Sequence, residues 1–199
     1  MPGTEVKRYA KGEAREREIL EATIDLIHEE GISAVTHRAV ADRAGVRLSA
    51  PSYFFPSIDD LIVEAFRSIV ANFMEGLETL STRIEAEDMS REAAVDAFVS
   101  LALKTAPRYD AVQFEAYMSA SRRPVLRDEV DAAIAATHRK GSTLVTASRR
   151  KNFDWAAPIL TAYADGVALH RVASPPEGIG AKPLREGLLA LMDGLPDRS

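Results

Sequence analysis

The chain contains no cysteine, which excludes disulfide bonds, thiolate metal ligands and a cysteine nucleophile. It also has no apolar run close to the ~18–20 residues that a membrane-spanning helix needs. The N-terminal residues MPGTEVKRYAKGEAR lack the apolar core of a signal peptide. We therefore expect a cytoplasmic protein that does not insert into a membrane.

Catalytic motifs are missing as well. There is no G-x-S-x-G, no H-E-x-x-H and no glycine loop of the kind that cradles phosphate. Gly178 and Gly180 lie in a proline-rich stretch with no strand pattern before them. The acidic run at Asp128, Glu129 and Asp131 is typical of a solvated helix face. The sequence therefore favours a protein that is not an enzyme and that has no cofactor or metal.

The net charge is −5, which by itself argues against a nucleic-acid-binding protein. The local balance is different, because residues 31–57 hold three arginines, Arg38, Arg43 and Arg47, and one acid, Asp42. Basic residues on or before the first expected helix, Arg15 among them, could also reach phosphates. We expect a modest, salt-sensitive basic surface.

The stretch from residue 36 to residue 55 has the pattern of two short helices joined by a tight turn. Thr36 is placed to cap the first helix with its hydroxyl. Gly45 stands where a left-handed residue ends a helix at low cost. A small residue at Ala41 lets two helices cross closely, and the second helix begins near Ser49. This pattern is typical of a helix-turn-helix, whose second helix can enter the DNA major groove.

The wider segment ILEATIDLIHEEGISAVTHRAVADRAGV, followed by YFFPSIDDL, resembles the N-terminal domain of the TetR family of transcriptional regulators. The agreement covers roughly residues 19–61, under a third of the chain, at many fixed spacings. The matching residues are Gly31, Thr36, Arg38, Val40, Ala41, Ala44, Gly45, Val46, Tyr53, Phe55, Ser57, Asp59, Asp60 and Leu61.

The resemblance implies roles for individual residues. Thr36, Arg38 and Tyr53 are expected to contact DNA phosphates, and His37 to approach one. Base edges are expected to face Arg47, Ser49, Ala50 and Ser52, where an arginine can grip a guanine through two hydrogen bonds. Ala50 and Pro51 could pack on a thymine methyl group.

Three positions depart from the common family pattern. Arg47 stands where serine often caps the recognition helix, so Ser49 is expected to cap it instead. Pro51 then falls in the first turn, where proline is tolerated. Ile58 stands where a lysine usually reaches a phosphate, which should weaken binding slightly.

The predicted fold is all-α: a three-helix helix-turn-helix domain followed by a helical ligand-binding and dimerisation domain, with about nine helices in total. We expect a flexible N-terminal arm at residues 1–12, the DNA-binding domain at 13–57 and the larger domain at 58–199. Helices are expected near residues 14–30, 36–44, 49–55, 58–80, 91–106, 111–121, 125–147, 154–172 and 184–192. Gly141 is a candidate break in the seventh, and residues 149–152 a basic loop.

The larger domain carries aromatic and polar residues that either form ordinary core or line a small-molecule pocket. The candidates are Phe98, Phe114, Tyr117, Arg122, Trp155, Tyr163 and His170. The family resemblance implies a homodimer through the last two helices. The predicted function is a homodimeric repressor that a small-molecule effector releases from a palindromic double-stranded operator. The alternative is a helical small-molecule-binding or scaffold protein without operator binding.

Overall fold

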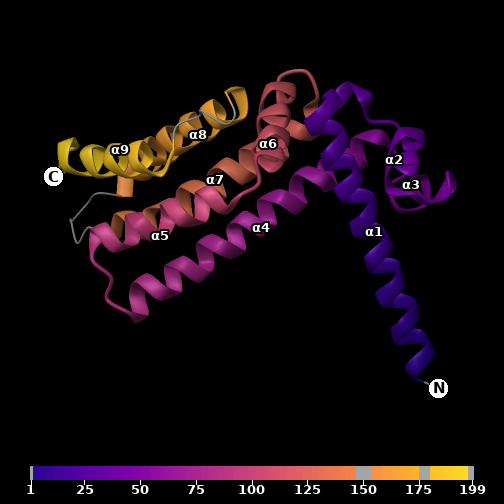
Figure 1. Cartoon of the computed structure of the whole chain (residues 1–199), viewed down its shortest axis with the longest axis horizontal. Coiled ribbons are helices and arrows are strands. Elements are labelled where there is room, and N and C mark those ends of the chain that lie inside the picture. Colours follow the sequence, from indigo (N-terminus) through magenta and orange to yellow (C-terminus); the bar gives the residue numbers. More distant parts are fainter. Residues whose placement is uncertain (1, 147–153, 175–179, 197–199) are drawn as a thin grey trace. The chain divides into compact units, whose positions relative to one another are not determined.

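A computed structural model describes residues 2–146, 154–174 and 180–196. Within these ranges all regular structure is helical, which confirms the all-α prediction (Figure 1). None of these helices is both long and apolar enough to cross a membrane. In chain order the elements are α1 (Pro2–Glu30), the 3-10 helix η1 (Ile32–Ala34), α2 (His37–Ala44), α3 (Ser49–Phe54), α4 (Ile58–Ala86), α5 (Arg91–Lys104), α6 (Pro107–Ala120), α7 (Pro124–Thr146), the 3-10 helix η2 (Asp154–Ala156), α8 (Ala157–Ala173) and α9 (Ala181–Gly194).

Several helix ends follow from local chemistry. The Ser57 hydroxyl accepts from the Asp60 amide at 3.0 Å, while the Asp60 carboxylate accepts from the Ser57 amide at 3.0 Å. This reciprocal pair is a capping box at the start of α4. The Ser90 hydroxyl accepts from the Ala93 amide and caps α5. Both caps join residues three positions apart, a spacing that can be recognised in the sequence.

Other helices differ in length from the expectation. Helix α1 begins at Pro2, well before the expected start near residue 14, and includes the residues predicted as a flexible arm. A proline is favourable in the first helical turn, and the Glu, Lys, Arg and Ala residues that follow are good helix formers. Helix α7 passes through Gly141 without a break. The predicted basic loop at residues 149–152 lies outside the described residues.

The described chain packs into two compact units, which we treat separately. Unit 1 comprises Met1–Ile69 and Ala111–Glu129. In it α1, η1, α2 and α3 share a core with the first part of α4, with α6 from residue 111 and with the start of α7. The Phe66 ring lies 6.5 Å from that of Tyr117, and Arg67 binds Glu129 through two hydrogen bonds of 2.8 and 2.5 Å.

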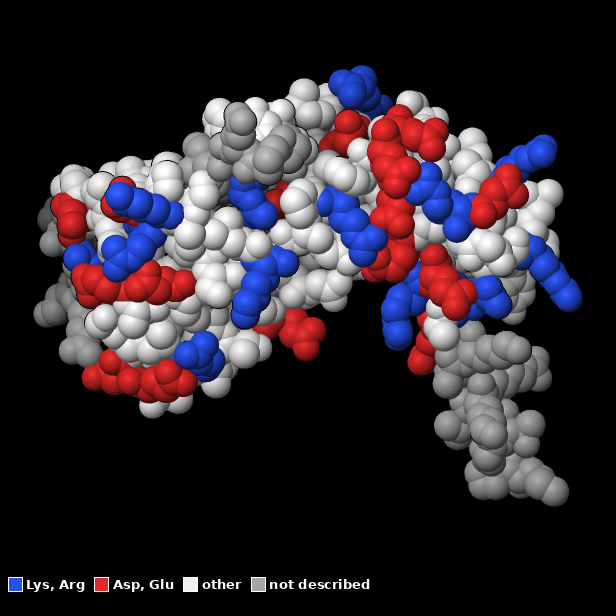
Figure 2. Space-filling view, viewed as in Figure 1, with Lys and Arg blue, Asp and Glu red and all other residues white. Residues whose placement is uncertain are grey.

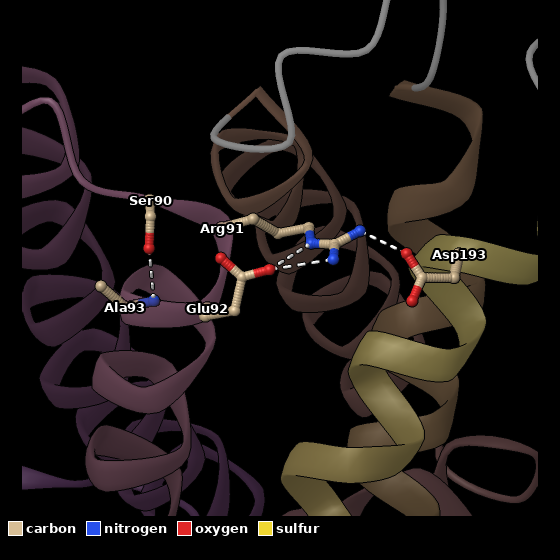
Figure 3. A network of polar contacts seen from close by, with 5 residues as sticks. All are labelled: Ser90, Arg91, Glu92, Ala93 and Asp193. Carbon is tan, nitrogen blue, oxygen red and sulfur yellow. Dashed lines mark hydrogen bonds and ion pairs between the residues drawn. The ribbon is translucent and has the colours of Figure 1, made fainter.

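Unit 2 comprises Val70–Asp110 and Val130–Ser199. Its buried core includes Leu77, Leu80, Val95, Phe98, Leu160, Leu184, Leu188 and Met192. At the start of α5, Arg91 holds Glu92 of its own helix and reaches Asp193 in the last turn of α9 (Figure 3). Farther along, Asp96 of α5 binds Arg185 near the start of α9 at 2.5 Å. The start of α5 thus meets the end of α9, and a later part of α5 meets the start of α9. The two helices therefore run antiparallel.

Helices α8 and α9 make close contact at a glycine. A Cβ atom added at Gly187 would lie 1.9 Å from the Tyr163 hydroxyl oxygen and 2.3 Å from the ring carbon that carries it. The Tyr163 hydroxyl donates to the carbonyl of Pro183 at 2.9 Å. Gly187 therefore provides the space in which the Tyr163 ring crosses to α9.

Candidate nucleic-acid interface

Helix α2 has the ends that its sequence predicts. The Thr36 hydroxyl accepts from the Ala39 amide at 3.0 Å. Gly45 follows the helix with φ +64°, and its amide donates to Asp42 at 3.4 Å while the Val46 amide donates to Ala41 at 3.0 Å. This pair of bonds is a Schellman motif, which needs a left-handed residue at the glycine position. It sets the direction in which the chain leaves α2 toward α3.

A bidentate ion pair holds α2 against α1. Arg43 donates to the two carboxylate oxygens of Glu29 at 2.9 and 2.7 Å. The hydrogen bonds from Arg43 lower the pKa of the Glu29 carboxyl below its usual value. Arg43 is thus directed at α1, and the arginines of the helix-turn-helix that extend from its surface are Arg38 and Arg47.

His37 also contributes to the packing of the hairpin. Its half-buried ring donates from Nε2 to the carbonyl of Phe55 at 2.9 Å, which ties the start of α2 to the end of α3. The structure therefore gives His37 a partner within the protein, and any phosphate contact would have to use the rest of the ring.

Helix α3 begins differently from the expectation. The residue at its N-cap is Leu48, which provides no side-chain hydrogen bond, so the expectation that Ser49 caps the helix is wrong. The Ala50 amide donates to the Arg47 carbonyl at 2.8 Å, so the turn tightens one residue earlier than expected.

Pro51 is buried. The expectation that it packs on a thymine methyl group is therefore wrong, because a buried ring is not available to DNA. The placement has a physical reason: a proline in the first turn of α3 donates no hydrogen bond there, so its ring can be enclosed without leaving an amide unsatisfied.

The remaining predicted contact residues lie on the surface of unit 1. Thr36, Arg38, Arg47, Ser49, Ser52 and Tyr53 are exposed, and Ala50 is half-buried. The Tyr53 side chain is 81% exposed and meets the Phe54 ring edge-on at a centroid distance of 5.2 Å. An open groove of about 550 Å³ runs along this surface, lined by Arg15, Gly45, Val46, Arg47, Ser49, Ala50, Tyr53 and Phe54.

The charge of this surface is modest. Arg38 lies 3.9 Å from Asp42, and both side chains are strongly exposed, so water screens the pair and leaves Arg38 available. Basic and acidic side chains intermingle on the face shown in Figure 2. As expected from composition, the groove presents a few cations, and any DNA contact should depend strongly on salt.

The predicted effector residues fall in both units. Phe114, Tyr117 and Arg122 belong to unit 1, where the Phe114 and Tyr117 rings meet edge-on at 6.0 Å and Arg122 is exposed. Unit 2 holds the other four: Phe98 is buried, Trp155 and Tyr163 are half-buried, and His170 is exposed.

Unit 2 contains a small cavity of about 40 Å³. Of the predicted effector residues it includes only Phe98. Its other walls are mostly apolar, but Asp165 contributes a carboxylate, and Thr137 and Thr161 contribute hydroxyls. The complete lining is Phe73, Leu77, Phe98, Thr137, Gly141, Leu160, Thr161, Ala164, Asp165 and Leu188.

Sequence reasoning missed a buried acid in unit 2. Asp110 is 8% exposed, and its Oδ2 atom has no hydrogen-bond partner among the described residues. Burial raises its pKa to about 6, against the opposing effect of Arg171, and the charge of Asp165 raises it further. Arg171 lies 3.8 Å away and donates to the carbonyls of Ala102 and Thr105 at the end of α5.

A sequence signal existed for part of this arrangement. Asp165 stands in the middle of α8, a helix that is otherwise largely apolar, and an isolated charge in such a helix often has a structural or functional partner. No group of three or more potential metal ligands occurs in the described parts of the chain.

Comparison with known families and structures agrees with this geometry. The model of the TetR-family bacterial regulatory proteins matches residues 19–65, and that of the tetracyclin repressor-like C-terminal domain matches residues 89–198. No protein with a curated description is significantly similar in sequence.

Solved structures resemble the chain over most of its length. SCO7518 of Streptomyces coelicolor A3(2), described as a candidate transcriptional regulator, is 28% identical with a TM-score of 0.67, over 89% of this chain and 98% of that one. The multidrug binding protein EbrR, in complex with proflavin, is 25% identical with a TM-score of 0.58, over 89% and 99%. A transcriptional regulator from Rhodococcus sp. RHA1 shares the fold, with a TM-score of 0.75 at 22% identity, over 89% and 94%.

A helix-turn-helix with an exposed second helix, in a chain whose other described elements are helical, is typical of one class of DNA-binding transcriptional regulators. The chain belongs to the TetR family of these regulators, as the residues of its helix-turn-helix first indicated.

Proposed function

We propose that the protein is a homodimeric repressor that binds a palindromic operator and is released by a small molecule. In this proposal residues 13–57 bind DNA, residues 1–12 are an N-terminal arm that continues helix α1, and residues 58–199 bind the effector and form the dimer. Two heads related by a two-fold axis would meet successive major grooves ~34–36 Å apart, or a multiple of that spacing. The protein acts in the cytoplasm, where its DNA is.

The surface formed by Arg38, Arg47, Ser49, Ser52 and Tyr53 carries this proposal. These side chains extend from unit 1, whereas Arg43 and His37 are engaged within it. DNA binding requires both kinds of polar group. Arg43 and His37 hold the helical hairpin in place, while the exposed side chains remain available to phosphates and base edges.

Selection of random duplex DNA by the full-length protein at moderate salt tests operator binding. An enriched palindrome is the expected result. Arg47→Ala should relax the choice of base at one symmetric position by ~1–3 kcal/mol, or roughly 5- to 150-fold. Arg38→Ala should weaken all DNA similarly and reduce the salt dependence, as loss of a phosphate contact does.

Arg83→Ala is the matched control for both variants. Arg83 is an exposed arginine of unit 2, paired with Glu87 at 3.2 Å, and its loss should leave DNA binding unchanged. If Arg47→Ala and Arg38→Ala both bound the operator as the wild type does, the proposed interface would be wrong.

The effector is proposed to bind in unit 2, by enlarging the cavity that includes Phe98 and Asp165. A pocket with apolar walls and one carboxylate suits a small molecule with an apolar body and a hydrogen-bond-donating or cationic group. The proflavin complex of EbrR supports a small-molecule effector for this chain. A coupling of ~1–3 kcal/mol between effector and operator would change operator affinity roughly 5- to 150-fold.

Release of labelled operator in a screen of small molecules tests this part of the proposal. Asp165→Asn should reduce the response to an effector found in this way without changing operator binding in its absence. An unchanged response to that effector would place its binding site elsewhere.

Homodimerisation is proposed to use α8 and α9. Ile159 and Leu169 of α8 are 37% and 47% exposed, so α8 has apolar side chains that a second subunit could cover. Light scattering should give the mass of a dimer, and Leu169→Glu should shift it toward the monomer. A stable monomer in the wild type would contradict the palindromic operator as well.

A further inference from the structure

Leu48 is an exposed apolar residue beside the residues of the proposed DNA-binding surface. Its side chain is 61% exposed, and it stands between the exposed residues Arg47 and Ser49 at the start of α3. Packing within the protein therefore does not account for a leucine here.

The local backbone does not account for it either. Leu48 stands directly before α3 with helical backbone angles, φ −52° and ψ −33°, which do not require an apolar residue. Its side chain makes no capping hydrogen bond. A polar side chain would fit the same backbone and be better solvated at this exposed position.

From its exposure and its place directly before α3, between Arg47 and Ser49, we infer that Leu48 determines operator specificity by packing on the 5-methyl group of a thymine. The thymine methyl is the apolar feature that a base pair presents in the major groove. Pro51, in the first turn of α3, is buried and is not available for such a contact. This inference rests on the proposed function, since it requires that α3 enter the groove.

The test replaces single thymines of the selected operator by deoxyuridine, in both half-sites together. This change removes one methyl group and leaves every hydrogen-bonding group of the base in place. At one thymine per half-site, the wild-type protein should bind the uracil site about fourfold more weakly for each methyl lost. Substitution at the other thymines should have little effect.

Three variants connect this effect to Leu48. Leu48→Ala should bind the thymine and uracil sites equally, because the side chain that covers the methyl group is gone. Leu48→Met keeps an apolar side chain of similar size and should retain most of the preference. Tyr53→Phe is the matched control on α3: it should weaken both sites together and leave their ratio unchanged. Circular dichroism of each variant checks that the exposed substitutions leave the fold intact.

The outcomes separate the inference from the function on which it rests. An enriched palindrome whose binding depends on no thymine methyl, or depends on one equally in wild type and Leu48→Ala, overturns the role of Leu48 and leaves operator binding standing. The absence of any enriched sequence overturns operator binding itself and the inference with it.

Discussion

Replacing Asp110 by asparagine should make unit 2 more stable at neutral pH and change how its stability depends on pH. Burial raises the pKa of the Asp110 carboxyl from its ordinary value of 3.8 to about 6, with Arg171 lowering it and Asp165 raising it. The folded protein therefore holds a proton that the unfolded chain releases between these two values. Stability due to this group is complete below pH ~4 and is lost as pH rises through 6.

The size of the effect follows from the two pKa values. At 1.36 kcal/mol for each pKa unit, a rise from 3.8 to about 6 corresponds to about 3 kcal/mol of stability lost above pH 6. Asp110→Asn keeps the shape of the side chain and cannot ionise. Relative to this variant, the wild type should lose up to about 3 kcal/mol between pH 4 and pH 7.

Urea denaturation followed by circular dichroism, at one fixed protein concentration and several pH values from 4 to 7, gives the two free energies of unfolding. Their difference removes the contribution of the other carboxylates. Asp96→Asn, at an exposed carboxylate paired with Arg185, is the matched control and should change stability by less than about 1 kcal/mol. The free energy of unfolding of the wild type, minus that of Asp110→Asn, should fall between pH 4 and pH 7. If this difference stays constant or rises, the reasoning is refuted.

Three further predictions concern stability, each measured by thermal or urea denaturation. Gly187→Ala should lower the free energy of unfolding by about 1–3 kcal/mol, because its methyl group would collide with the Tyr163 ring. In a Tyr163→Ala background the same substitution should cost much less. Equal costs in the two backgrounds would contradict the contact. Gly45→Ala should cost about 1–2 kcal/mol through its positive φ alone, whereas Gly166→Ala, in α8 with open space around it, should be neutral or stabilising. Thr36→Ala should cost about 1 kcal/mol by removing the cap of α2, and an unchanged midpoint would show the cap to be dispensable.

The parts of this structure that the sequence predicts are those set within a few residues. Thr36, Gly45, Ser57 and Ser90 each define a helix end through bonds to neighbours three or four positions away. Such caps depend on residue type and spacing, so they can be recognised before any tertiary structure is known.

Features that depend on distant residues were not predictable in this way. Arg43 counts as a free cation in the sequence, but in the fold it meets Glu29 of the preceding helix. Asp110 and Arg171 lie far apart along the chain, so the sequence alone does not indicate that they meet in the fold. The role proposed for Leu48 could not be predicted, because an apolar residue in a turn suggests packing and only its exposure in the fold suggests a different role.

The composition of unit 1 limits how DNA-binding domains can be exchanged between related regulators. It is built from two separate segments, because residues 111–129 complete a core that residues 1–69 begin. A fragment ending at residue 57 would lack Phe66, and one ending at residue 69 would leave Phe66 without Tyr117. A chimaera that preserves this core would need junctions after residues 69, 110 and 129. Single substitutions can change the DNA-binding surface. The core that supports this surface, however, can be transferred only together with residues 111–129 from the later part of the chain.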